Sequence, residues 1–463
     1  MHFQKSVIAL AIGASLAAHT AFASPLVSEA KRDLGTFDFD SGFALIDDAS
    51  LDIKLRMVAY NRDSYNKPMN DFMKPAASMY TQAERRDAGL AVWADFQSGW
   101  MWDFIGFDIS AQGAKALQND GFAPTTQLWE HNDIDTISRI GVANIKFRGG
   151  NETLGFDGRV GRMIPNLPMI APEMDSALPQ VLEGALINGH YKMVSGYVAR
   201  MEKAGHYQSS QMDKMGTDIN VNPFTGVGEF KEIPLEMAGI TLGKPGESAN
   251  IGIHYGEQQD YLKKWMVKAE AGLPMGEENF LIGSLVYHKQ EGGKYYNPFL
   301  GGKNYEADMY ALNLTGLMGD NLMLRGGYSQ VGDEAYNVTF TNELYNRTNH
   351  TTMIWNDFNH AEMKSVMFGG VYKLSAFGLD DVSLLAQAAY GWDAKATMIP
   401  MPMNGLLPLT DDYAWEGVIG ATYEVFDGPL QGLWLNVSYN KDGGGYSNTH
   451  GGRVILDYTV KVF

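Results

Sequence analysis

The sequence predicts an all-β fold, namely a transmembrane antiparallel β-barrel of 18 strands with long extracellular loops. Two features of the chain lead to this prediction. The last ten residues, from Val454 to Phe463, alternate between the two faces of a strand and end in an aromatic residue, as a strand between lipid and water does. The first residues have the charged, apolar and small-residue parts of a secretory signal. Together they indicate a protein of the bacterial outer membrane.

The N-terminal segment contains Lys5, an apolar stretch over residues 7–18 and a small-residue site that ends at Ala23. We therefore predict that residues 1–23 are a cleaved signal peptide and that residues 24–463 form a single barrel domain. A membrane anchor is the alternative. The apolar stretch is shorter than the roughly 20 residues that a membrane helix needs, which favours the signal peptide.

The composition narrows the fold further. The chain is 45% hydrophobic, but after the signal it has no continuous apolar run long enough for a helical span, and a closed barrel is the other structure that satisfies its backbone in lipid. The 52 glycines and 12% aromatic residues favour a turn-rich β protein with interfacial aromatics. The lack of cysteine excludes disulfides and thiolate metal sites. The net charge of −18 argues against nucleic acid as a partner.

Strand-like segments recur along the whole chain, joined by alternately short and long connections. Short connections carry turn residues, for example Asn188-Gly189 and Asp427-Gly428-Pro429. An even number of strands places both termini on the periplasmic side. The long polar connections, expected to be extracellular, are residues 61–88, 113–138, 163–181, 202–235, 331–361 and 392–412. The predicted strands are residues 51–60, 89–98, 103–112, 139–148, 154–162, 182–189, 191–201, 236–244, 249–257, 262–271, 280–289, 307–317, 321–330, 364–373, 381–391, 413–425, 432–440 and 452–463.

Alternation assigns side chains to the two faces of the clearer strands. In residues 433–439, leucine, valine and tyrosine face the lipid and polar residues face the lumen. In residues 139–148, the same rule directs Lys146 and Arg148 into the lumen. Trp434 also turns inward, where it could stack on a sugar, and an interfacial position at the strand end is the alternative. The polar interior predicts a water-filled conduit. A soluble β-sandwich is less consistent, because so many strands would need two large sheets.

Several stretches resemble the OprD family of outer-membrane porins, which includes substrate-specific and chitoporin-like members. The resemblance covers nearly the full mature chain. It implies an eighteen-stranded barrel that admits specific small hydrophilic nutrients passively and without a cofactor. The matching stretches are Gly42-Phe43, Ile46 to Leu51, Asn61 to Asp63, Asp95 to Gly99, Arg159 to Pro168, Leu178 to Gln180, Glu183 to Ala185, Gly327 to Asp333, and Asn356 to Phe358 with Glu362, Lys364 and Ser365.

The resemblance also implies which residues line the pore. The third long loop, residues 163–181, should fold inward as a constriction, and its prolines make it stiffer than a free extracellular loop. A ladder of basic residues should lie opposite this loop, although these residues could instead be paired with Asp and Glu across the barrel. After Arg200 the only arginines are Arg325, Arg347 and Arg453, which weakens the expectation of carboxylate selectivity. The candidate pore residues are Arg56, with Lys54 on its face, Lys146, Arg148, Arg159, Arg162, Asn166, Glu173, Asp175, Ser176 and Asp333.

We therefore expect an outer-membrane porin for passive, substrate-selective diffusion of small hydrophilic nutrients, which could be carboxylates, amino acids or oligosaccharides. A channel for chitin oligosaccharides, a barrel enzyme and a surface adhesin without conductance are the alternatives. The sequence contains no catalytic motif in a suitable context. We predict no catalytic, cofactor or metal site. Glu130, Asp133 and Asp135 could hold Ca²⁺, but a solvated acidic loop explains them more simply.

The expected partners follow from this location. They are outer-membrane lipids and lipopolysaccharide, a small-molecule permeant and the barrel-assembly machinery, which would read the terminal Phe463. No nucleic acid is expected. The barrel should be a monomer or a loose trimer.

Overall fold

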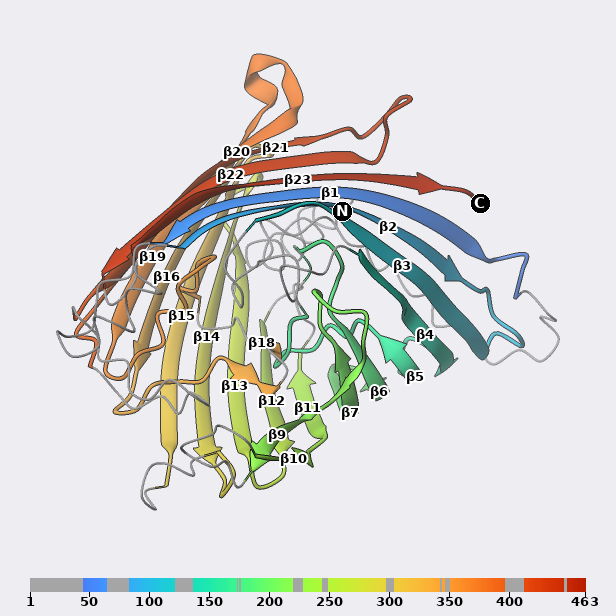
Figure 1. Ribbon diagram of the computed structural model, residues 1–463, viewed down its shortest axis with the longest axis horizontal. Helices are drawn as coiled ribbons and strands as arrows, with labels where there is room; N and C mark the ends of the chain where they lie inside the picture. The colour runs from blue at the N-terminus through green and yellow to red at the C-terminus, as the bar shows by residue number, and fades with distance from the viewer. Residues whose placement is uncertain are drawn as a thin grey trace.

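A computed structural model shows a closed antiparallel barrel (Figure 1), and the prediction of an 18-stranded barrel is confirmed. Each barrel strand pairs with its neighbours along the chain, and the last strand pairs with the first. The signal peptide prediction lies outside the described part of the chain. The structure describes residues 45–64, 83–120, 136–172, 174, 176–219, 228–243, 249–296, 304–341, 344–345, 350–395, 412–444 and 448–463.

The barrel strands match all the predicted segments. They are β1 (Ser50–Ser64), β2 (Ala83–Gln97), β3 (Ile105–Asp120), β4 (Thr136–Gly150), β5 (Leu154–Met163), β6 (Val181–Tyr191), β7 (Val194–Gly205), β11 (Leu235–Leu242), β12 (Ala249–Gln258), β13 (Leu262–Pro274), β14 (Asn279–Gly292), β15 (Glu306–Met318), β16 (Leu322–Val331), β19 (Lys364–Leu374), β20 (Leu379–Trp392), β21 (Ala414–Glu424), β22 (Leu433–Gly444) and β23 (Thr449–Lys461). Short elements lie in the connections: β8 (Asp213–Lys214), β9 (Gly216–Ile219), β10 (Glu229–Glu232), β17 (Thr339–Phe340), β18 (Leu344–Tyr345) and the 3₁₀-helix η3 (Ser375–Phe377).

The barrel closes between its first and last strands. β1 pairs with β23 from Ser64 opposite Thr449 to Asp52 opposite Lys461. On its other edge, β1 pairs with β2. Closure satisfies the backbone groups of both terminal strands, which lipid could not do. In Figure 1, β20 to β23 and β1 to β3 form one side of the barrel, and β11 to β16 form the other.

Two local features differ from the predicted strands. The Asn188-Gly189 pair lies inside β6, and the chain turns three residues later, where Lys192 has a φ of 53°. At the extracellular end, β2 begins at Ala83 and β3 ends at Asp120, well beyond the predicted limits. These strand ends extend above the apolar band of the wall and are polar, so the alternation of apolar and polar residues does not reveal them.

A β-bulge changes the direction of side chains along β4. β3 advances by two residues, from Ile109 to Ala111, while the paired part of β4 advances by three, between Ile140 and Ala143. The extra residue reverses the alternation. Arg139 therefore faces inward and is buried, although strict alternation along the strand would direct it to the lipid.

The interior is not polar throughout, which corrects the prediction from alternation. Part of the wall presents buried apolar side chains inward, and residues of several connections pack against them, among them the third loop (residues 164–180) and the seventh loop (residues 332–363). Their apolar residues replace water at the wall, which stabilises both loops inside the barrel. The inward wall residues of this cluster are Leu182, Leu186, Ala199, Met201, Leu235, Met237, Leu262, Met266 and Val286.

Candidate pore constriction

The third loop packs against two different parts of the barrel wall. Near its start, Leu167, Met169 and Ile170 are buried in the apolar cluster on β6, β7, β11 and β13. Near its end, Ala177 and Leu178 are buried in a second cluster that contains residues of β1 to β4, β22 and β23. The loop therefore runs inside the barrel between these two anchor points.

Arg56 fixes the middle of this loop to β1. Its side chain is 1% exposed, and Nη1 donates to the carbonyl oxygens of Met174 (2.7 Å) and Ser176 (2.8 Å). Its Nε and Nη2 donate to the two carboxylate oxygens of Asp457 at 2.7 and 2.8 Å. Every donor atom is thus engaged, and Arg56 acts here as a support for the loop. Because its fork is planar, it can bind the carboxylate on one edge and carbonyls on another.

Further basic groups lie beside this pair. The Nζ of Lys54 lies 2.9 Å from Asp457 Oδ2. Both cations lie over the ring of Trp93, with Lys54 Nζ at 4.6 Å and Arg56 Cζ at 4.8 Å from its centroid. Trp93 is 2% exposed. This wall is therefore positive but internally compensated, as the alternative interpretation of the basic ladder predicts.

Arg139, which was not among the predicted pore residues, holds the other end of the loop. Its guanidinium donates to the carbonyl of Pro179 in the third loop, and to the carbonyls of His206 (2.6 Å) and Ser209 (3.0 Å) in the fourth connection. Gln112 accepts its Nε proton at 3.0 Å. Arg139 therefore links two extracellular connections to the wall. The β4 bulge that turns it inward has no clear signature in the sequence.

Lys146 and Arg148 lie near the periplasmic connection between β2 and β3. The Nζ of Lys146 donates to Asp108 Oδ1 (2.7 Å) and to the carbonyl of Ser98 (2.8 Å). Arg148 forms an ion pair with Asp103, and both cations lie over the ring of Trp100. Both are compensated by carboxylates, so neither presents a free charge to a permeant.

Arg159 differs from these residues. It is half-buried on β5, where it lies opposite Lys146 on one neighbouring strand and Leu186 on the other. Its neighbour Val160 is 53% exposed on the lipid side, so alternation directs Arg159 to the lumen. Among the described residues, no carboxylate forms an ion pair with it. It is therefore a lumen cation whose charge remains available.

Arg162 lies on the outer face of β5 rather than in the lumen, since Val160 and Arg162 share one face and Met163 is buried inside. Its Nε lies 2.9 Å from Glu183 Oε2, and Nη1 donates to the carbonyl of the lipid-facing Ile140 at 3.0 Å. The structure thus does not bring Arg162 to the loop. The sequence already contained this signal, because residues two apart on a strand face the same side.

The remaining candidates are dispersed. Asn166 is exposed in the third loop, and Asp333 is exposed at the start of the seventh loop. The side chain of Ser176 is buried, and its backbone carbonyl, rather than its hydroxyl, binds Arg56. Glu173 and Asp175 lie outside the described residues.

The seventh loop also enters the barrel, a feature that the sequence analysis missed. The loop buries its own apolar side chains against the wall: Tyr336, Val338, Phe340, Met353, Phe358 and Met363 are each at most 6% exposed. Arg62 of β1 lies over the ring of Trp355, with Cζ 4.9 Å from the centroid. The signal in the sequence was the large apolar residues inside a segment that is polar on average. In the described part of the chain, the seventh loop therefore occupies the interior together with the third.

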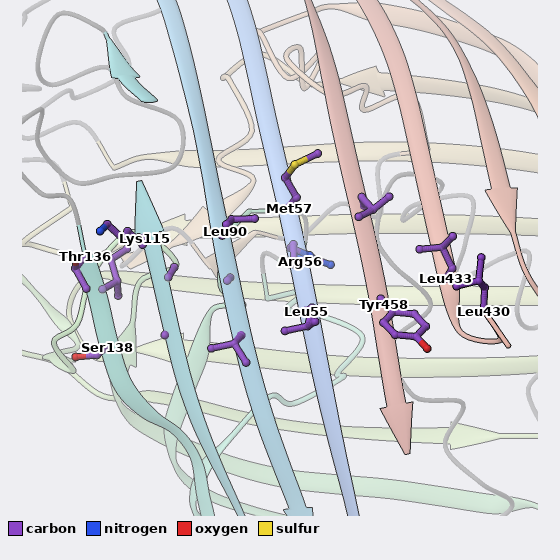
Figure 2. Close-up of a pocket in the computed structure, with 16 residues that line it drawn as sticks. Leu55, Arg56, Met57, Leu90, Lys115, Thr136, Ser138, Leu430, Leu433 and Tyr458 are labelled. Atoms are coloured by element: carbon purple, nitrogen blue, oxygen red, sulfur yellow. The ribbon is translucent and has the colours of Figure 1, made fainter. Parts of the chain in front are cut away.

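Trp434 turns inward as alternation predicts, but it is 6% exposed in the cluster that holds Trp93 and Ile455. Its ring has little surface left for a passing solute. An apolar groove with a volume of about 780 Å³ lies instead on the outer wall (Figure 2). Leu55, Leu90 and Val92, each 45–49% exposed, line it. Because these residues face the lipid, this groove is not part of the permeation path.

The described residues hold no group of three or more His, Asp or Glu side chains arranged for a metal ion. Glu130, Asp133 and Asp135 lie outside them. No helix in the described part of the chain has the length and apolar character needed to cross a membrane.

The comparisons with known proteins decide the family. The family model described as "outer membrane porin, OprD family" matches residues 41–462. The chain belongs to the OprD family. It is therefore a channel of the bacterial outer membrane rather than an enzyme, surrounded by lipid and lipopolysaccharide. One curated relative is the porin-like protein GalP of Pseudomonas putida. It is 21% identical to this chain over 444 residues, which cover 90% of this chain and 93% of GalP.

Solved porin structures share the fold of this OprD-family chain at low identity. OpdK of Pseudomonas aeruginosa, solved with vanillate, has a TM-score of 0.72 at 16% identity, with 90% of this chain and 100% of that chain covered. A BenF-like porin from Pseudomonas fluorescens has a TM-score of 0.71 at 16% identity and the same coverage. OccK2 (OpdF) of Pseudomonas aeruginosa, in complex with glucuronate, has a TM-score of 0.69 at 15% identity, with 91% and 100% covered. These likenesses establish the barrel.

Proposed function

We propose that this porin admits small hydrophilic solutes that carry a carboxylate, by passive diffusion. The observation that carries the proposal is the state of Arg159, a lumen-facing cation without an ion-pair partner among the described residues. A fixed, uncompensated cation in a narrow pore attracts anions and replaces part of their hydration. The vanillate and glucuronate named for two structural neighbours are carboxylates, which supports the same class.

The constriction in this proposal is formed by the third loop, with the seventh loop beside it. Arg56, Lys146 and Arg148 maintain a positive wall, but their carboxylate partners leave Arg159 as the ligand for the solute. Asn166, Glu173, Asp175, Ser176 and Asp333 stay candidates for polar contacts along the path. A neutral sugar channel is less well supported, because Trp434 is packed rather than open.

The proposal extends to assembly. Phe463 is 62% exposed at the end of the chain, and its carbonyl accepts a hydrogen bond from the amide of Leu51. An exposed terminal aromatic fits recognition by the barrel-assembly machinery. The pore is complete within one chain, so a monomer or a loose trimer serves the function equally well.

Single-channel recordings of the refolded protein in planar bilayers test this function. Small monocarboxylates, amino acids and oligosaccharides would be added in turn. The proposal expects an ionic conductance that monocarboxylates interrupt in a concentration-dependent way. Interruption by sugars alone would favour the oligosaccharide alternative, and the absence of any conductance would contradict a channel.

A further inference from the structure

The seventh loop is attached to the barrel at two distant points, one through a buried basic side chain and the other through a buried acidic side chain. One is Lys264 on β13, and the other is Glu416 on β21. Both side chains are fully buried, at 0% exposure. Neither takes part in the basic ladder or in the contacts of the third loop.

Lys264 binds the first part of the loop. Its Nζ donates to the carbonyl oxygens of Asn337 (2.6 Å) and Thr339 (2.7 Å). The same Nζ lies 4.6 Å from the ring centroid of Phe340 and 5.5 Å from that of Tyr336. No carboxylate among the described residues pairs with Lys264. The loop's own carbonyl dipoles and aromatic faces therefore compensate this buried charge, so the loop cannot leave without exposing it to an apolar wall.

Glu416 binds the second part of the loop. Oε1 accepts from the backbone amide of Ile354 (3.0 Å), and Oε2 accepts from that of Asn356 (2.9 Å). The amide of Trp355 is shared between both oxygens, at 3.2 and 3.1 Å. Three successive amides that converge on one carboxylate form an anion-binding nest. The turn is rigid in itself, since Met353 donates its amide proton to the carbonyl of Asn356 at 2.9 Å.

The two attachments complement each other. The cation holds carbonyl groups and the anion holds amide groups, so each uses the charge that suits its part of the backbone. Between them, neutral contacts complete the attachment: Gln258 accepts the amide proton of Thr341 at 2.9 Å, and Ser329 and Thr351 share a hydrogen bond at 2.7 Å. The loop's position across the lumen is thus determined by side chains of the wall.

We propose that Lys264 and Glu416 are positioning residues that hold the seventh loop across the lumen and thereby set the width of the pore. This inference rests on the proposed channel function. Loss of either charge would free one part of the loop and widen the path, while the barrel wall itself would stay intact.

The variants are Glu416→Gln and Lys264→Met, which keep the side-chain volume and remove the charge. Asp442→Asn is the matched control for the first, because Asp442 is a buried carboxylate opposite Glu416 in the register, and its Oδ1 accepts the amide proton of Thr449. Lys268→Met is the control for the second, since Lys268 lies on the same strand and pairs with Glu270. Glu416→Asp keeps the carboxylate and should restore part of the wild-type behaviour.

Single-channel conductance and the largest neutral polymer that still enters the pore are measured for each variant. Glu416→Gln and Lys264→Met should raise the conductance about twofold or more and shift the polymer cut-off upward, because pore diameter governs both. The two controls should match the wild type. Wild-type conductance and cut-off in both charge variants would overturn the proposal.

A second measurement does not depend on conductance. The chain has no cysteine, so Ile354→Cys supplies a single thiol beside the Glu416 nest. Its reaction rate with a charged thiol reagent should rise at least tenfold when Glu416→Gln is added and should stay unchanged with Asp442→Asn. A rate unaffected by Glu416→Gln would contradict the attachment. If the wild type conducts no ions, the proposed function fails, and the thiol rates still decide whether Glu416 holds the loop.

Discussion

Arg56 and Asp457 form a bidentate, fully buried ion pair across the seam between the first and last strands, with N–O distances of 2.7 and 2.8 Å. The two residues lie opposite each other in the β1–β23 register, 401 positions apart in the sequence. The remaining edge of the guanidinium binds the third loop. One residue pair therefore connects barrel closure with the position of the loop inside the pore.

Asp457→Asn should destabilise the folded barrel more than Arg56→Met does. Asp457 compensates two buried cations, Lys54 and Arg56, whereas Arg56→Met leaves the carboxylate with Lys54 at 2.9 Å. Removing one partner of a buried pair costs about 3–5 kcal/mol. Urea unfolding in lipid vesicles measures the difference. The exposed outer pair of Arg200 and Glu236 supplies the control, since Glu236→Gln should change the free energy of unfolding by less than about 1 kcal/mol. Equal effects at Asp457 and Glu236 would refute this assignment.

Arg139→Met should loosen the third and fourth connections together. The substitution removes four hydrogen bonds, three of which end on loop carbonyls. Hydrogen bonds of charged groups contribute about 1.5–3 kcal/mol each, so a loss of at least about 2 kcal/mol is expected. Open-channel current noise should also increase. Arg200→Met, on the exposed outer face, is the control, and a quiet, stable Arg139→Met channel would disprove the role of this residue.

Arg159→Gln should lower the preference of the pore for anions and weaken its interaction with carboxylates by about tenfold, which corresponds to about 1.4 kcal/mol. Reversal potentials in a salt gradient and the frequency of solute block report the two effects. Folding should be little affected, because no described carboxylate depends on Arg159. Arg162→Gln is a close control, since that residue lies on the outer face of the same strand. Equal selectivity in the two variants would remove Arg159 from the path.

Acid should loosen the seventh loop through His360. Burial lowers the pKa of His360 from 6.5 to about 4. The unfolded loop therefore takes up a proton before the folded one does, and the packing, fully retained above pH 6.5, loses stability as the pH falls toward 4. Channel gating recorded between pH 7 and pH 4 should become more frequent over this window. His360→Asn should remove the part of the pH dependence that arises here. An identical pH profile in the wild type and in His360→Asn would contradict a role of His360 in the acid response.

The strands could be predicted from the sequence because their information is local. Alternation and turn residues found every barrel strand, and they directed Lys146 and Arg148 inward as the structure has them. One error arose where a single residue changes the alternation, as the β4 bulge does for Arg139. A bulge depends on the pairing of two strands, and no single segment reveals it.

The partners of the lumen charges could not be predicted in the same way. Arg56 and Asp457 stand at opposite ends of the chain, and their contact follows only from barrel closure. Lys264 and Glu416 bind backbone carbonyl and amide groups of the seventh loop. Every chain carries such groups, so the side-chain sequence does not reveal which of them are bound. The family resemblance predicted that the third loop folds into the barrel. The seventh loop is polar on average, so only its large apolar residues could have indicated that it also folds inward.

The most direct test of the central claim is solute flux into proteoliposomes. Block of the ionic current shows that a solute binds in the pore, whereas flux shows that the solute passes through it. Liposomes containing the protein are placed in isosmotic solutions of a small monocarboxylate, a neutral sugar of similar size or a larger oligosaccharide, and the rate of swelling is followed. The account predicts fastest swelling with the monocarboxylate, a preference that Arg159→Gln reduces and Arg162→Gln preserves. Swelling no faster than in protein-free liposomes would contradict a channel, and faster entry of the neutral sugar would contradict carboxylate selectivity.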